Sequence, residues 1–200
     1  MSRTAKSSTR LDPTVRRAQI VDAATVSFHQ RDPSSVSLEE VAERAGVSRS
    51  LVYAYFGDRG GLIAAVYLRN VERLDDELGQ VIETALPDEM RLARIVRRYL
   101  EFARDNAPAW HLMAATGGVQ HPAVQAARRR RIERIASAWG GAPEARLLAR
   151  GVIGLLEAAA LDWIEYQDCE LDRAADVLFA VLWSGLSGLD RHDLILVSTA

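Results

Sequence analysis

The sequence predicts an all-α protein of about nine helices, with a small three-helix unit at the N-terminus and a larger helical domain behind it. Apolar residues recur at helical spacing through most of the 200 residues. Serine, aspartate, proline and glycine punctuate these segments where helices are expected to start and stop. A content of 48% hydrophobic and 26% charged residues is typical of a globular protein that buries a core.

The first expected helix covers residues 14–30, where Ile20, Ala24 and Phe28 share one side. It ends at Asp32-Pro33, because the residue before a proline is disfavoured in the α conformation.

Residues 37–56 contain two short helical patterns joined by Ala45-Gly46-Val47. Ser37 and Glu40 have the spacing of a capping box, and Ser48 can cap the second helix. Gly46 stands where the first of these helices must stop, a position that favours a left-handed residue without a Cβ. Two helices joined by such a turn predict a helix-turn-helix.

The second of these short helices has two different faces. One face can pack on Val41, Ala45 and the first helix, whereas the other has hydrogen-bonding groups and no large aliphatic side chain. The packing side carries Ser48, Val52, Tyr55 and Phe56, and the polar side carries Arg49, Ser50, Tyr53 and Ala54. A polar helix face of this kind suits the major groove of DNA.

Residues 16–66 resemble the N-terminal domain of the TetR family of transcriptional regulators. The resemblance rests on Arg17-Ala18-Gln19-Ile20-Val21-Asp22-Ala23-Ala24, Phe28, Val41-Ala42, Ala45-Gly46-Val47-Ser48, Val52-Tyr53, Tyr55-Phe56, Arg59 and Leu62. It implies an all-helical homodimer with an N-terminal three-helix DNA-binding domain and a C-terminal domain that binds a small effector and dimerises. We therefore expect a flexible basic arm at 1–13, a DNA-binding domain at 14–60 and an effector-binding and dimerisation domain at 61–200.

The chain departs from the family pattern at three places. Asp32 replaces a frequent glycine, and Leu51 replaces a small or hydroxylated residue. The entry to the fourth helix reads Gly57-Asp58-Arg59-Gly60-Gly61, with Arg59 in place of the usual lysine. Each of the last two glycines weakens a helix by roughly 1 kcal/mol relative to alanine. One hypothesis is that they soften the link between the two domains; the other is that they are merely tolerated.

Chemistry assigns roles to the expected DNA-binding residues. Arg49 can bind guanine bidentately, Ser50 and Tyr53 can reach phosphates or base edges, and Leu51 can touch a thymine methyl group. Ser37, Ser48, Tyr55 and Arg59 are better placed for the DNA backbone, although Tyr55 fits core packing equally well. Arg17 completes the expected set. The basic arm either lies against DNA or only solubilises the chain.

Beyond residue 61 the pattern predicts helices at about 62–86, 88–104, 108–116, 122–139, 143–166 and 172–189. The run Arg128-Arg129-Arg130-Arg131 is interpreted as a solvated face rather than a nucleic-acid site. The last two helices are apolar on more than one face, which predicts a four-helix bundle between two subunits. The expected dimer interface is Leu148, Val152, Leu155, Leu156, Leu178, Leu182, Trp183 and Leu186. A twofold dimer presents two recognition helices ~34–36 Å apart to a near-palindromic operator in double-stranded DNA.

The middle helices contain a set of aromatic and polarizable residues that suits either a largely apolar effector cavity or ordinary core. These candidates are Tyr99, Phe102, Trp110, His111, Met113, Trp163 and Tyr166. The sequence does not identify the effector.

Several classes of function are disfavoured. The single Cys169 excludes an intramolecular disulfide, and one Cys with four scattered His gives no zinc spacing. No signal peptide, membrane span or catalytic motif is found, so we expect a cytoplasmic protein that is not an enzyme and has no metal or cofactor. The predicted function is a DNA-binding transcriptional regulator, by family default a repressor released by a small molecule. The alternatives are a helical dimeric protein-interaction module and a ligand-responsive activator.

Overall fold

A computed structural model describes residues 12–31, 35–115 and 121–187, with side chains left out at 112–115. All regular elements in this part of the chain are helices, which confirms the predicted all-α class. The nine helices are α1 (Pro13–Gln30), α2 (Leu38–Arg44), α3 (Arg49–Phe56), α4 (Arg59–Ile82), α5 (Asp88–Asp105), α6 (Ala107–Ala115), α7 (Pro122–Ala138), α8 (Pro143–Tyr166) and α9 (Leu171–Ser187).

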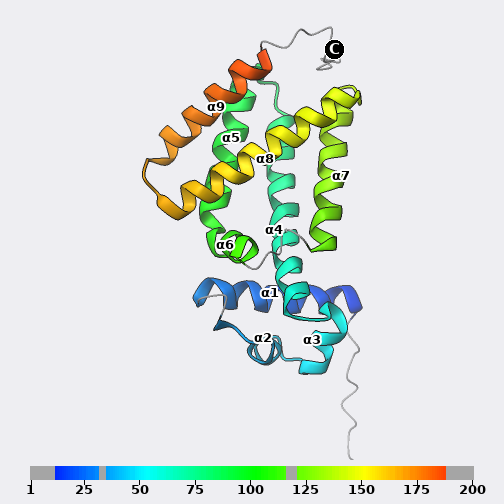
Figure 1. Cartoon of the computed structure of the whole chain (residues 1–200). Helices are drawn as coiled ribbons and strands as arrows, with labels where there is room; N and C mark the ends of the chain where they lie inside the picture. Colours follow the sequence, from blue (N-terminus) through cyan, green and yellow to red (C-terminus); the bar gives the residue numbers. More distant parts are fainter. Residues whose placement is uncertain (1–11, 32–34, 116–120, 188–200) are drawn as a thin grey trace, which may run out of the picture.

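The N-terminal helices form a compact unit, in which α1 lies across the foot of the larger domain and α2 and α3 lie beneath it (Figure 1). Its core contains Ile20, Val41 and Val52, each at most 1% exposed. Leu62 and Val66 of α4 belong to the same apolar cluster. The first two turns of α4 therefore pack with α1–α3, although the boundary expected from sequence lies at residue 60.

The local signals in the helix-turn-helix have the predicted geometry. Ser37 Oγ accepts from Glu40 N at 3.2 Å, and Ser37 N donates to the Glu40 carboxylate at 2.8 Å. Ser48 Oγ accepts from Leu51 N at 3.3 Å, and Gly46 has φ +63°. The capping box, the second cap and the left-handed glycine are all confirmed.

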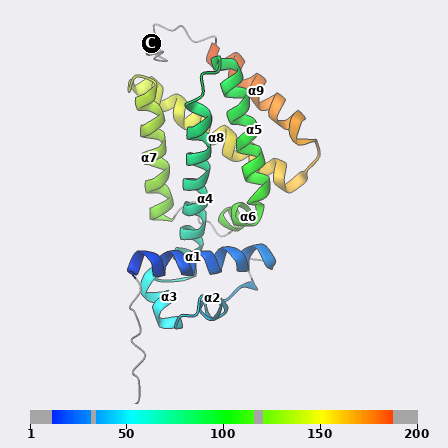
Figure 2. The ribbon, with the colours of Figure 1, turned by 180° about the vertical axis from the view of Figure 1, so that it is seen from behind.

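The long helix α4 rises from the N-terminal unit into the larger domain, with α5 and α7 on either side of it (Figures 1 and 2). Helix α8 crosses the bundle, α9 packs mainly on α5, and α7 packs mainly on α8. The central core contains Leu74, Val96, Tyr99, Leu100 and Ala160, all at most 1% exposed.

The sequence suggested that the arginine run on α7 is a solvated face, but part of the run forms ion pairs with neighbouring helices. Arg128 pairs with Glu157 of α8 at 2.7 Å, and Arg131 pairs with Asp75 of α4 at 2.8 Å. Arg134 also reaches Asp75, at 2.6 Å. Residues three apart on a helix share a face, so Arg128 and Arg131 turn inward together, whereas Arg129 and Arg130 between them are exposed. The run ties α7 to α4 and α8.

The expected dimer residues differ in how far they are buried within one subunit. Leu156, Leu178 and Leu182 are buried inside the subunit, and Val152, Leu155 and Leu186 are half-buried against the same core. Leu148 packs beside α7, and the half-buried Trp183 stacks on Phe179.

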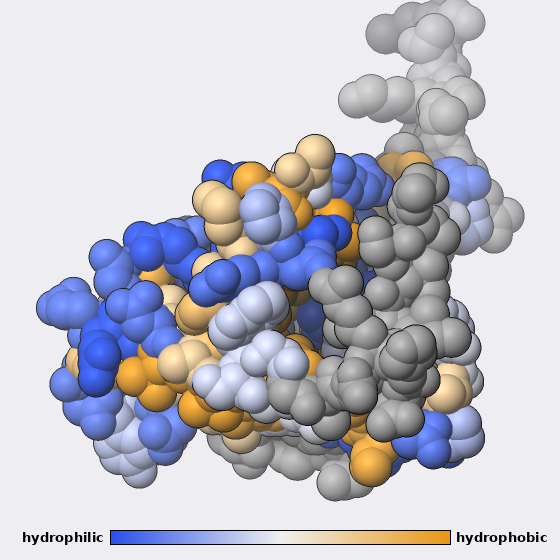
Figure 3. Space-filling model, turned by 90° about the horizontal axis from the view of Figure 1, so that it is seen from above, coloured by the Kyte–Doolittle hydropathy of each residue, from blue (hydrophilic) through white to orange (hydrophobic). Residues whose placement is uncertain are grey.

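The apolar side chains that these two helices do expose are different ones. Leu147 is 72% exposed, Val181 56% and Val177 45%. Viewed from above, orange apolar side chains also lie between blue polar ones (Figure 3). Among the described residues, apolar side chains near the start of α8 and along α9 therefore remain exposed within one subunit.

Candidate nucleic-acid interface and ligand cavity

Helix α3 presents the polar face that its sequence predicts. Arg49, Ser50, Tyr53 and Ala54 are exposed, whereas Val52 is fully buried. The short helix is held by this one buried valine and by the half-buried rings of Tyr55 and Phe56, which pack on the N-terminal core. Its polar side chains are thereby presented on a fixed scaffold.

Arg49 is oriented by two neighbours. Its Nη2 donates to Tyr53 Oη at 3.1 Å, and the guanidinium carbon lies 5.3 Å from the centre of the Tyr53 ring. It also forms an ion pair with Glu39 of α2. The hydrogen bond to Tyr53 and the charge of Glu39 raise the pKa of Arg49 above its ordinary value. Sequence reasoning missed Glu39, because it lies ten positions away and only the helix-turn-helix brings it close.

The other expected DNA contacts surround α3. The Ser48 and Ser50 hydroxyls lie 3.0 Å apart, and Ser37 caps α2. Arg17 is exposed, with its guanidinium carbon 5.3 Å from the centre of the Phe56 ring. Arg59 Nε donates to the Val36 carbonyl at 3.3 Å, which ties the start of α4 to the segment before α2.

Leu51 and Tyr55 are half-buried rather than freely exposed. The structure thus brings all nine expected residues to the N-terminal unit.

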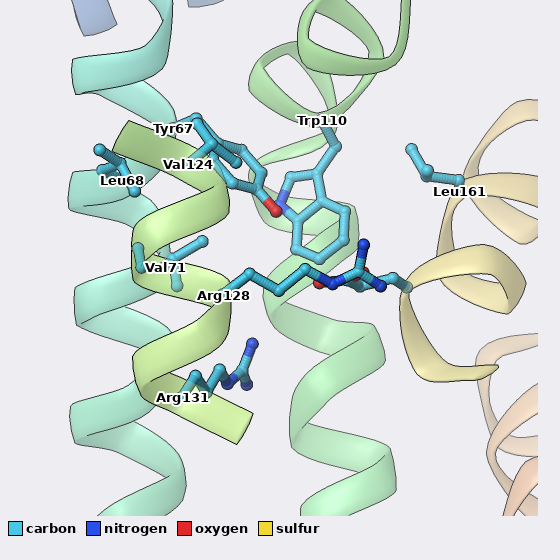
Figure 4. A pocket seen from close by; sticks show the side chains of 10 residues that line it. Tyr67, Leu68, Val71, Trp110, Val124, Arg128, Arg131 and Leu161 are labelled. Carbon is cyan, nitrogen blue, oxygen red and sulfur yellow. The ribbon is translucent and has the colours of Figure 1, made fainter. Parts of the chain in front are cut away.

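The larger domain contains a cavity of about 60 Å³ between α4, α6, α7 and α8. Figure 4 shows Tyr67 and Val71 of α4 at the left, Leu161 at the right, and Trp110 between them above the Arg128 side chain. Its walls are mostly apolar with a charged side, and they comprise Tyr67, Leu68, Val71, Trp110, Val124, Ala127, Arg128, Arg131, Glu157 and Leu161.

Burial perturbs the polar groups around this cavity. It raises the pKa of Glu157, although Arg128 and Arg131 act in the opposite direction. It also raises the pKa of Tyr67 to about 12, so this phenol stays protonated at neutral pH. Within the described part of the chain, Tyr99 Oη and Trp110 Nε1 are buried without a hydrogen-bond partner. The Tyr99 and Trp110 rings meet edge to face, with centroids 5.7 Å apart.

Of the six expected pocket residues whose side chains the structure describes, only Trp110 lines this cavity. Tyr99 and Phe102 are buried in the core, and Trp163 donates its indole N–H to the Cys169 carbonyl at 2.9 Å. His111 and Tyr166 are exposed, the latter by 65%. The side chain of Met113 lies outside the described residues.

The expectation missed Tyr67, Arg128, Arg131 and Glu157, all of which line the cavity. A usable signal was the charge of Glu157 within the apolar stretch 152–164. A carboxylate there must find a cation or a polar ligand, because an unpaired buried charge is costly.

Comparison with known proteins identifies the family. Residues 20–66 match the family described as bacterial regulatory proteins, tetR family, and residues 88–185 match the tetracyclin repressor-like C-terminal domain. The chain belongs to the TetR family of transcriptional regulators. Together the two matches span both structural parts of this TetR-family protein, including all of α5, α7 and α8.

Individual relatives agree with this assignment. The HTH-type transcriptional activator FasR of Mycolicibacterium smegmatis is 27% identical over 188 residues, covering 89% of this chain and 86% of that protein. A TetR-like regulator from Rhodococcus sp. RHA1 is 29% identical with a TM-score of 0.61, covering 90% of this chain and 100% of the other. A regulator from Streptomyces coelicolor is 27% identical with a TM-score of 0.66, covering 91% and 86%.

Two searches for other kinds of site gave negative results within the described ranges. No helix there combines the length and apolar character needed to cross a bilayer. Nor do three or more His, Cys, Asp or Glu side chains gather there as a potential metal site.

Proposed function

We propose that this TetR-family protein is a homodimeric repressor, bound to a near-palindromic operator and released when a small molecule enters the cavity beside Trp110. The observation that carries the proposal is the position of α4 and α6. Both helices contribute walls to the cavity, and both pack on α1 of the N-terminal unit. A ligand that displaces either wall therefore acts on an element that touches the DNA-binding domain.

In this proposal α3 is the recognition helix. Arg49 contacts guanine, Ser50 and Tyr53 contact bases or phosphates, and Leu51 touches a thymine methyl group. Arg17, Ser37, Ser48, Tyr55 and Arg59 fix the register through the DNA backbone. The DNA-binding domain is residues 14–60 together with the first turns of α4, whose leucine and valine complete its core.

The dimer forms through α8 and α9. Exposed Leu147, Val177 and Val181 give these helices an apolar surface that one subunit leaves in water. Trp183 and Leu186 are only half-buried, but at about 100° per residue Trp183 lies on nearly the opposite side of α9 from Val181. A twofold axis through the exposed apolar surface places two copies of α3 on one side of the DNA.

A ligand-responsive activator is the second candidate, since the relative from M. smegmatis is named an activator. A reporter gene behind the selected operator separates the two, because deleting the regulator raises expression for a repressor and lowers it for an activator.

Selection from random DNA with the full-length protein tests the core of the proposal. We expect enrichment of a near-palindrome whose affinity falls steeply with salt. Arg49→Lys removes the bidentate geometry and should relax selectivity at one base pair per half-site by about 1–3 kcal/mol. Val181→Asp should shift the dimer toward monomer and weaken operator binding, whereas Asp176→Asn, at an exposed polar position of α9, serves as the control. Binding without sequence preference would refute the proposal.

A further inference from the structure

The cavity holds a buried donor that needs an acceptor. Trp110 is only 4% exposed, lines the cavity, and its Nε1 has no hydrogen-bond partner among the described residues. An indole N–H can only donate. A buried donor left unpaired is costly, and a ligand with an acceptor atom recovers that cost. Figure 4 shows the Trp110 ring beside Tyr67 and above the Arg128 side chain.

The charged side of the cavity also favours an acceptor. Arg128 uses Nη2 to bind Glu157 at 2.7 Å, and the remaining N–H groups of its guanidinium are further donors. Both cations of the lining are paired, but the Arg128 side chain is 30% exposed and that of Arg131 only 10%, so Arg128 is the more accessible cation for a ligand. Two cations and one anion line the cavity, namely Arg128, Arg131 and Glu157, whereas Asp75, the partner of Arg131, does not line it.

We propose that the cavity binds the carboxylate end of a small, otherwise apolar molecule, with Arg128 and the Trp110 indole N–H as its donors. This proposal rests on the proposed function, because it assigns the chemical class of the effector. The carboxylate of the ligand either shares the Arg128 guanidinium with Glu157 or replaces Glu157 as its partner. The apolar remainder packs on Leu68, Val71 and Leu161.

The cavity size sets the first probes. A volume of about 60 Å³ accommodates about four to six water-sized groups, since one such group needs about 10–15 Å³ by this measure. Butyrate, with six non-hydrogen atoms, is therefore a suitable probe. 1-Butanol and butylammonium have the same chain with a neutral or a cationic end, so the three together isolate the effect of the end group.

The indole N–H signal of Trp110 reports occupancy directly. The chain has four tryptophans, so its proton–nitrogen NMR spectrum has a small set of indole signals, and Trp110→Phe identifies the relevant one. We expect butyrate to shift this signal at lower concentration than 1-butanol or butylammonium. If 1-butanol or butylammonium binds better, the carboxylate class is wrong while the cavity remains an effector site. If none of the three shifts the signal, the cavity is not a ligand site, and the effector part of the proposed function fails with it.

Substitution of Glu157 gives a second test with a definite direction. Glu157→Gln removes the competing carboxylate and should tighten butyrate binding by about tenfold, as expected for a partly screened repulsion between two carboxylates. Arg128→Lys should weaken it. Glu165→Gln and Arg130→Gln change exposed residues on the same two helices and should leave it unchanged. Operator binding by each unliganded variant reports correct folding. Weaker butyrate binding by Glu157→Gln would overturn the proposal.

Discussion

Gly61, at the start of α4, is expected to tolerate no side chain. A Cβ added there lies 2.0 Å from the Phe56 carbonyl oxygen and 3.1 Å from its carbon, so the backbone between α3 and α4 must move. That movement disturbs the cap in which Gly61 N donates to Asp58 Oδ1 at 2.8 Å. Gly60 is the matched control, because its added Cβ meets only the flexible Asp58 carboxylate, at 3.2 Å.

The magnitude for Gly61→Ala follows from three contributions. Overpacking costs about 1–3 kcal/mol, the lost cap costs about 1 kcal/mol, and alanine in a helix returns about 1 kcal/mol. The net loss of about 1–3 kcal/mol corresponds to a fall in Tm of about 2–12 °C for a chain of this size. Gly60→Ala should instead be neutral or raise Tm by up to about 4 °C.

Thermal unfolding followed by circular dichroism measures both variants, and operator affinity shows whether the position of α3 has changed. A Gly61→Ala protein as stable as Gly60→Ala would refute the steric reasoning. The idea that both glycines are merely tolerated does not hold for Gly61, whose neighbouring backbone excludes a Cβ. Substituting both glycines at once therefore does not isolate the flexibility of this link.

Four further substitutions test other contacts. Ser37→Ala removes a capping-box hydroxyl and should cost about 1 kcal/mol in denaturant unfolding. The Ser37 N–H and Arg31 lower the pKa of Glu40 in the folded protein. The stability from this contact is therefore present above the pKa of Glu40 in the unfolded chain and disappears as the pH falls through its pKa in the folded protein. A pH-independent difference in stability between Glu40→Gln and the parent would contradict this. Glu39→Gln should change selectivity at the base pair that the proposed function assigns to Arg49. The control Glu43→Gln removes the same charge one turn along α2 and should only strengthen binding to all DNA sequences. Equal base selectivity in the two variants would exclude a positioning role for Glu39. Asp75→Asn leaves Arg131, whose side chain is 10% exposed, without its carboxylate partner and should lower the free energy of unfolding by roughly 2–4 kcal/mol. The control Glu133→Gln breaks an exposed ion pair and should change stability little. Equal losses in the two variants would show that burial of the pair is not decisive.

The parts of the fold that were predictable from sequence are those encoded locally. The caps at Ser37 and Ser48 and the left-handed Gly46 depend on residues within about four positions of one another, as their hydrogen bonds and backbone angle show. The two faces of α3 follow from helical periodicity, which likewise needs no knowledge of the rest of the molecule.

The cavity was not predictable because its contacts are distant in sequence. Arg131 and Asp75 meet across two helices, and nothing near either residue indicates which of four consecutive arginines turns inward. The criterion of aromatic residues in the middle helices selected Tyr99 and Phe102, which the core uses for packing. Aromatic side chains suit a core and a ligand cavity equally well, so residue type alone does not separate the two.

Helix α4 begins inside the N-terminal core and continues to the far end of the C-terminal domain, so a tilt of this helix displaces one domain relative to the other. Its 24 residues span about 36 Å at 1.5 Å per residue. A tilt of about 5° over that length moves one end by about 3 Å relative to the other, which is almost the rise of one base pair, about 3.4 Å. In the proposed dimer each subunit has one such helix, and opposite tilts of the two helices add. Under the proposed function, a small displacement at the cavity would thereby move the two recognition helices out of register with successive major grooves.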